Sequence, residues 1–206
     1  MIDTLGHTER LALVYAPGRA RAVWLVLLAL DARLARLVTG AREPLLAQIR
    51  LAWWRERLAE PVGKRPHGEP LLAAADAWGD RAAGLIPVVD GWEAMLGEPP
   101  LSAAALAEWV EGRGKVCAAL AGVLGVPAGD AVRLGQGWAL GDLVRLTGEA
   151  GAAEAMLAAH DWRGGRLPRA MRPLLVLHGL ARGHAQGRDA GPGALIGAIR
   201  RGILGF

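Results

Sequence analysis

Hydrophobic residues along this chain recur every three or four positions, which is the period of an α-helix with one buried face. Proline and glycine interrupt the pattern where helices are expected to begin and end. Ser102 is a candidate N-cap for the segment that follows it. The pattern predicts helices over 17–39, 44–60, 70–83, 88–96, 103–124, 128–160, 172–185 and 194–204, with loops over 61–69 and 161–168. We therefore expect an all-α protein.

The predicted helix over 44–60 carries arginine and tryptophan beside a wide apolar surface. Arg50, Trp54 and Arg57 share one stripe of the helix, at spacings of four and three residues. Further apolar stripes adjoin this one, so we expect the helix to be mostly buried. An arginine beside a buried stripe needs a carboxylate, a phosphate or water to replace its hydration. Arg50 is therefore expected to have a partner.

Composition agrees with one helical domain. The 206 residues are rich in alanine, leucine and glycine and include a single Phe and a single Tyr, which favours helix over sheet. This length suits one hydrophobic core, so we expect a single domain over 1–206. The longest apolar run, 22–30, is far shorter than the ~20 residues of a membrane-spanning helix. Cys117 is the only cysteine, which excludes an internal disulfide, and we expect it in the core.

Positive charge is concentrated in the last quarter of the chain. Residues 151–206 contain eight arginines and three acids, a net charge of +5, while the whole chain carries +4. Arg200 and Arg201 fall on the predicted helix 194–204, which has an apolar face. We expect reversible association of this segment with an anionic membrane or an acidic partner. Nucleic acid is not an expected partner, because the aromatic residues lie within apolar helices rather than among the basic residues.

Five segments together resemble the squalene/phytoene synthase family, in order and at similar spacing. The similarity covers about residues 19–149, and the tryptophan- and arginine-rich helix is its most specific part. The segments read LLALDARLARLV, REPLLAQIRLAWWRERL, VVDGWEAML, WVEGRGKVCAALAGVLG and LGQGWALGDLVRLTGE. The resemblance implies an all-α isoprenoid-synthase fold around a central cavity. Active members of the family join two isoprenoid diphosphates head to head, using two aspartate-rich helices that hold Mg²⁺ against the diphosphates.

The acidic motifs of that family are degraded in this chain. Two acids four residues apart on a helix share one face, which lets them bind one metal cluster. The first motif keeps Asp31 but has Ala35 at its second acidic position. In the second motif Leu146 and Ala150 stand where the family has aspartates. The metal site has thus lost most of its expected ligands, so no cofactor is expected, and Mg²⁺ only if the chain is an enzyme.

The remaining polar residues define the candidate site. Arg145 and Glu149 match the family's second motif, and Asp142 and Glu149 lie seven residues apart on one helical face. With Asp31 they could hold a single ion. The alternative, which we favour, is a set of ion pairs in which Asp142 and Glu149 contact Arg145 while Asp31 contacts Arg50 across helices. Histidine adds nothing to a metal site, since no two histidines are spaced as helical ligands.

The aromatic residues decide between two states of the central cavity. Trp53 and Trp54 are expected to line it, next to Asp31 and Arg50. An open apolar cavity at Asp31, Arg50 and Asp142 would suit an isoprenoid or lipid ligand. A cavity filled by tryptophan side chains would suit a protein without that chemistry.

Three functions follow from the resemblance. The degraded motifs are most similar to the phytoene-synthase-like assembly factors of respiratory complex I, which implies a non-catalytic role with a protein partner at a membrane surface. An isoprenoid- or lipid-binding protein is the second possibility, and an active prenyltransferase is the third. The N-terminal residues lack the pattern of a secretion signal, so we expect a cytoplasmic protein, with peripheral attachment to the inner face of the membrane as an option.

Overall fold

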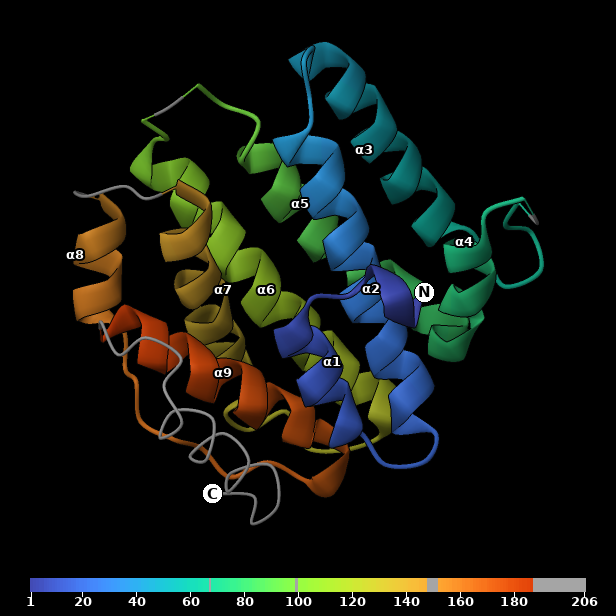
Figure 1. Ribbon diagram of the computed structural model, residues 1–206. Helices are drawn as coiled ribbons and strands as arrows, with labels where there is room; N and C mark the ends of the chain where they lie inside the picture. The colour runs from blue at the N-terminus through green and yellow to red at the C-terminus, as the bar shows by residue number, and fades with distance from the viewer. Residues whose placement is uncertain (67, 99, 148–151, 187–206) are drawn as a thin grey trace.

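The computed structural model describes residues 1–66, 68–98, 100–147 and 152–186, and it is a bundle of α-helices (Figure 1). The described part of the chain contains no β-strand, which confirms the all-α prediction. The helices are α1 His7–Val14, α2 Ala20–Thr39, α3 Pro44–Ala59, α4 Pro70–Ala74, α5 Ile86–Ala94, α6 Ala103–Leu124, α7 Ala131–Thr147, α8 Ala152–Ala159 and α9 Arg172–Ala185. A 3₁₀ segment, η2, covers Ala75–Leu85 between α4 and α5.

Several helix boundaries follow directly from local sequence. Pro44 occupies the first turn of α3, where its missing N–H is not needed. The Ser102 side chain accepts a hydrogen bond from the Ala105 backbone N–H at 3.2 Å, which confirms it as the N-cap of α6. Gly125 ends α6 in the left-handed conformation, with φ of 66°, which glycine adopts without a Cβ penalty.

Helix α6 lies at the centre of the bundle. It packs between α5 and α7, and α7 in turn packs against α9 (Figure 1). One continuous hydrophobic core contains buried residues from Leu5 to Leu180. Glycines allow the closest helix contacts: a Cβ added at Gly141 of α7 would lie 2.3 Å from the Ala181 Cβ of α9. The two backbones therefore pack at a distance that only glycine permits at this position.

Two predicted helices differ in the structure. The segment predicted as one helix over 70–83 forms the short helix α4 followed by η2, because Gly79 has a positive φ of 56° that no continuous helix contains. The segment predicted over 128–160 forms α7 and α8, with residues 148–151 outside the described part of the chain. The predicted helix 194–204 and its arginines also lie outside the described residues.

The prediction that the helix over 44–60 is mostly buried was wrong. Helix α3 lies at the edge of the bundle and packs mainly against α5 and η2 (Figure 1). Its buried residues are Ala47, Leu51, Trp54 and Leu58. The opposite side, which includes Ile49 and Trp53, is exposed, because none of the described elements covers it. Arg50 lies at the margin of the buried side, toward α2, and is exposed as well. The wide apolar surface read from the sequence therefore belongs only in part to the core.

Two further sequence expectations can be compared with the structure. Cys117 is fully buried in α6, which confirms it as a core residue, and burial raises the pKa of its thiol to about 12. The apolar run 22–30 lies within α2 and is largely buried. Across the described ranges, the structure contains no helix with the length and hydrophobicity needed to span a membrane.

We predict that Gly141→Ala lowers the free energy of unfolding by about 2 kcal/mol. The added methyl group would overlap the Cα and Cβ of Ala181, and overpacking of a close-packed core costs about 1–3 kcal/mol, more than the ~1 kcal/mol that alanine gains over glycine within a helix. Urea unfolding followed by circular dichroism measures the change. Gly164→Ala is the control, because no heavy atom lies within 4 Å of the added Cβ; equal losses in both variants would contradict the packing explanation.

Candidate functional site

The centre of the bundle contains a buried arginine, Arg113 of α6, which is only 1% exposed. It lies on the apolar stripe of its helix, whose other members include Leu106, Trp109, Val116 and Leu120. The spacing between successive members alternates between three and four residues, so Arg113 must point the same way as its apolar neighbours. A charged group placed there requires compensation from the surrounding helices.

Two aspartates from two other helices provide that compensation. The Arg113 Nη2 donates to both carboxylate oxygens of Asp31 in α2, at 2.9 Å and 2.8 Å. Its Nη1 donates to Asp142 Oδ2 in α7 at 2.5 Å. The indole Nε1 of Trp92 in α5 also donates to Asp31 Oδ1, at 2.9 Å. One guanidinium group thus connects α2, α6 and α7, and Trp92 adds α5 to the same network.

Tryptophan rings enclose the guanidinium group. Its central carbon lies 4.4 Å from the ring centroid of Trp109 and 4.1 Å from that of Trp138. Both distances are well within the range of a favourable cation–π contact. Trp92 packs edge-on against Trp109, with 4.4 Å between ring centroids. The sequence left open whether the cavity at Asp31 and Asp142 is empty or filled by tryptophan side chains. The structure shows that tryptophan side chains fill it.

Burial and charge act in opposite directions on the ionised groups. Burial disfavours the charged guanidinium, but the carboxylates of Asp31 and Asp142 more than offset this, and the pKa of Arg113 lies above its ordinary value. Burial raises the pKa of Asp31, and the Arg113 cation and the hydrogen bonds from Trp92 and Arg113 oppose that rise. Arg113 is therefore a permanent cation, and the site is built around it.

The predicted ion pair between Asp31 and Arg50 was wrong. Asp31 points into the core and contacts Arg113, whereas Arg50 is exposed on α3. Residues Arg33 and Leu37 of α2 face Arg50 across a surface pocket. They lie two and six positions after Asp31, which places them about 200–240° around the helix from it. Asp31 and Arg50 therefore lie on different sides of α2.

The remaining predicted residues fall into two groups. Arg145 belongs to α7, but its side chain and Glu149 lie outside what the structure describes, so the predicted ion pairs of Arg145 with Asp142 and with Glu149 stay predictions. Trp53 and Trp54 do not line the centre that holds Asp31. They line the surface pocket with Arg50, and their rings pack edge-on with 5.2 Å between centroids.

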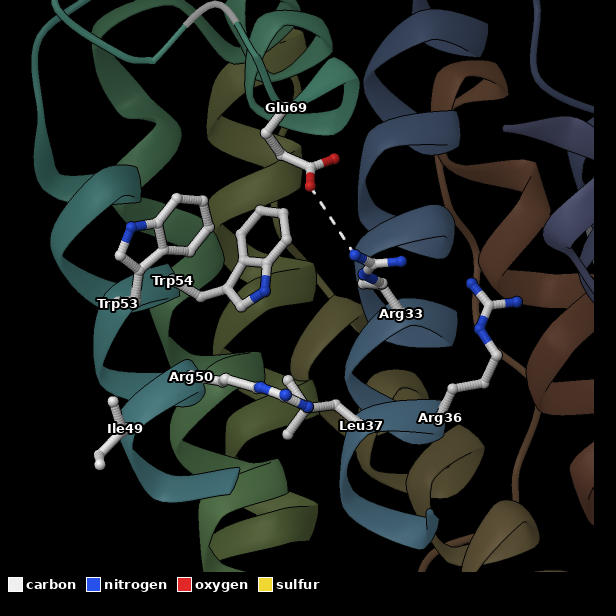
Figure 2. Close-up of a pocket in the computed structure, with 8 residues that line it drawn as sticks. All are labelled: Arg33, Arg36, Leu37, Ile49, Arg50, Trp53, Trp54 and Glu69. Carbon is white, nitrogen blue, oxygen red and sulfur yellow. Dashed lines mark ion pairs between the residues drawn. The ribbon is translucent and has the colours of Figure 1, made fainter. Parts of the chain in front are cut away.

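The surface pocket lies between α2 and α3 and has a volume of about 750 Å³ (Figure 2). Figure 2 shows Arg50 extending from α3 toward α2, with Trp54 beside it. Arg33 forms a long ion pair with Glu69 at 3.8 Å, and both are partly exposed. The lining residues are Arg33, Arg36, Leu37, Ile49, Arg50, Trp53, Trp54 and Glu69. This pocket and the Arg113 centre have no residue in common.

Sequence reasoning missed Arg113, although the sequence contains a signal for it. Charged residues on a buried stripe are rare unless they are paired. Arg113 interrupts the apolar stripe of the helix over 103–124, in the position where a leucine or valine would complete the pattern. The tryptophans that enclose it come from α6 and α7, and Trp92 comes from α5. Their convergence depends on tertiary packing and could not be read from the spacing.

Comparison with known proteins identifies the family. A model of the squalene/phytoene synthase family matches residues 4–171. The chain belongs to this family. Its all-α bundle is accordingly the isoprenoid-synthase fold of the squalene/phytoene synthases. Searches of curated proteins and of solved structures found no match.

The central residues do not fit the Mg²⁺ cluster that squalene/phytoene synthase chemistry implies. Mg²⁺ requires several oxygen ligands in near-octahedral geometry. Asp31 and Asp142 both accept hydrogen bonds from Arg113, so the guanidinium cation lies where a metal ion between these carboxylates would have to lie. Within the described ranges, no three acidic, histidine or cysteine side chains are grouped so that they could hold a metal ion. The cation that neutralises these aspartates is part of the protein.

We predict that Arg113→Met lowers the free energy of unfolding by about 3–5 kcal/mol, because it leaves Asp31 and Asp142 buried without their cation. The triple variant with Asp31→Asn and Asp142→Asn should recover at least half of the loss, since no stranded charge remains. Chemical denaturation of the three proteins measures both effects.

Arg55→Met is the matched control for this prediction. Arg55 contacts Asp90 and Glu93, but all three side chains are about one-third exposed, so its loss should cost no more than about 1 kcal/mol. Equal losses for Arg55→Met and Arg113→Met, or no recovery in the triple variant, would show that the central ion pairs do not stabilise the bundle.

Proposed function

We propose that this chain is a non-catalytic member of the squalene/phytoene synthase family that acts by binding. The observation that carries the proposal is the position of the Arg113 guanidinium between Asp31 and Asp142. Ionised diphosphates need cationic groups that stabilise the charge of the departing group. Here Arg113, the buried cation that the structure describes in the centre, is already neutralised by two carboxylates and enclosed by tryptophan rings. The arrangement supports a structural role for residues that the family resemblance associates with catalysis.

The degraded motifs support the same conclusion from the sequence. Ala35 follows Asp31 at the position of the second acid of the first motif, and Leu146 occupies an acidic position of the second. Neither the alanine nor the leucine side chain can supply an oxygen ligand, whatever the arrangement of the neighbouring residues. The function proposed from the resemblance is binding to a partner of the respiratory complex I assembly type, or to an isoprenoid or lipid.

We expect the purified protein to release no pyrophosphate from farnesyl or geranylgeranyl diphosphate in the presence of Mg²⁺. The physical reason is that Asp31 and Asp142 already neutralise Arg113 and are not free to hold metal ions. A coupled pyrophosphate assay, with extraction and chromatography of long-chain products, measures the reaction against a sample without protein.

Catalytic release of pyrophosphate would be recognised by its dependence on a metal ion and on Asp142. Release that chelation by EDTA abolishes, and that Asp142→Asn removes while the circular dichroism spectrum stays that of the folded protein, would establish an active prenyltransferase. Asp90→Asn is the control, because Asp90 is a partly exposed aspartate that contacts Arg55, outside the Arg113 centre. Its activity should then equal that of the unaltered protein.

The assembly role can be tested in the native host. Deletion of the gene should lower the amount of assembled complex I on native gels and leave complex II, the control, unchanged. The triple variant Asp31→Asn, Arg113→Met, Asp142→Asn should restore assembly, because a binding function needs the fold and not the carboxylates. Unchanged complex I after deletion would exclude this partner, and an increase in melting temperature with farnesyl thiodiphosphate would then assign the isoprenoid-binding role.

A further inference from the structure

Helix α3 presents a row of exposed apolar side chains beside the surface pocket. These four residues, here named the α3 ridge, are Leu45, Leu46, Ile49 and Trp53, with exposed fractions of 67%, 48%, 58% and 38%. Ile49 follows Leu46 by three residues and Leu45 by four, and Trp53 follows Ile49 by four, so all four lie on one side of the helix within about 100°. Contiguous exposed apolar side chains of this size are typical of a surface that contacts another apolar phase.

The pocket beside the α3 ridge is positively charged. Its lining contains three arginines and a single acid, Glu69, for a net charge of +2. Arg33 has a distant ion pair with Glu69, and among the described residues Arg36 donates only to the Thr4 carbonyl, at 3.3 Å. Arg50 forms no ion pair with any residue that the structure describes. The pocket thus has more positive than negative charge, and it lies next to the exposed side of α3.

The other charges near the ridge lower this balance by one unit. Glu56, one turn after Trp53, contacts Arg57, and Arg57 also pairs with Glu60 at 2.6 Å. Arg55 is on a different side of the helix and pairs with Asp90 and Glu93 of α5. Arg42 and Glu43, both exposed, precede the helix and balance one another. Glu56, Arg57 and Glu60 together carry −1, and Arg42 with Glu43 carries zero, so the net charge next to the ridge is +1, with its positive part in the pocket.

We propose that the α3 ridge and the adjoining pocket bind an anionic phospholipid bilayer. The ridge would enter the boundary of the acyl chains, and the arginines of the pocket would contact phosphate groups. Trp53 lies between the two parts, where tryptophan is favoured at membrane interfaces because its ring is apolar and its N–H is polar. A bilayer fits both features at once, since it offers an apolar phase directly under a layer of anions. The inference concerns a different surface from the Arg113 centre and does not depend on whether that centre is catalytic.

Vesicle flotation of the full-length protein tests the proposal. We expect binding to phosphatidylcholine vesicles that contain phosphatidylglycerol, weaker binding at high salt, and none to pure phosphatidylcholine. Arg50→Gln should weaken binding about fivefold, because one basic residue at an anionic surface contributes ~1 kcal/mol. Ile49→Ser should also weaken it through the loss of apolar contact, and both residues are exposed, so neither change should lower the melting temperature.

A matched pair of control variants lies on α1. Arg10 and Val14 are exposed, and Val14 has the same 67% exposure as Leu45. Arg10→Gln and Val14→Ser should leave vesicle binding unchanged. Losses equal to those of the α3 variants would show that binding reflects overall charge and hydrophobicity, and would overturn the proposed surface.

Quenching of tryptophan fluorescence identifies the part of the protein that contacts the bilayer. Lipids with brominated acyl chains should quench part of the tryptophan fluorescence, and Trp53→Phe should remove that part. Trp162→Phe is the control, because the Trp162 indole is only partly exposed and donates to Leu157 O at 3.0 Å. Quenching that survives in Trp53→Phe would contradict the proposal.

Three further outcomes would overturn it. The first is no vesicle binding, which would leave the ridge to a protein partner. The second is binding that Arg200→Gln and Arg201→Gln abolish while the α3 variants do not, which would assign it to the C-terminal arginines. The third is saturable binding of inorganic diphosphate to the pocket without any vesicle binding, which would make the ligand a soluble anion.

Discussion

The centre of this bundle depends on one buried cation with two carboxylate partners. Arg113 interacts with Asp31 and Asp142, so each of the three helices that carry them supplies a charge that the others need. Such a network adds less net stability than its short distances suggest, because three charges lose their hydration. Its effect on which packing of the helices is stable is larger. Any packing that separates α2, α6 and α7 would leave a charge buried without a partner.

The tight packing of the helices around this centre follows from small residues. Beyond the Gly141 contact between α7 and α9, a Cβ at Gly112, next to Arg113, would lie 2.3 Å from the Pro87 carbonyl oxygen of α5. These glycines weaken the helices locally but let α6 approach α5 and α7 approach α9, while Trp109 of α6 and Trp138 of α7 enclose the guanidinium group. Close backbones and large indole rings together fill the space, which explains why the polar centre contains little room for a ligand.

Local features of the fold could be predicted, and long-range pairings could not. Ser102, Pro44 and Cys117 occupy the expected places because capping, proline geometry and burial depend on neighbouring residues. The resemblance also identified Asp31 and Asp142 as members of one site. It did not identify the cation between them, since a helical period shows which side of a helix a residue faces but not which residue of another helix it meets. The same limit explains the error with Arg50: its neighbour Trp54 is buried, but the helical period could not show that Arg50 itself lies at an exposed margin and meets neither Asp31 nor another described acid.

The two arginine-containing sites differ in whether the arginine is already neutralised, and this difference decides what each can bind. Arg113 is surrounded by its own carboxylates and by aromatic rings, so an incoming anion would have to displace a buried ion pair. Arg50 is exposed beside apolar residues and lacks an ion-pair partner among the described residues, so an anion can approach it without removing another group. The loss of hydration on binding is also smaller at the surface pocket, where water reaches the guanidinium in the free protein. A chain of this family whose inner cation is neutralised therefore has its accessible positive charge on the outside of the bundle.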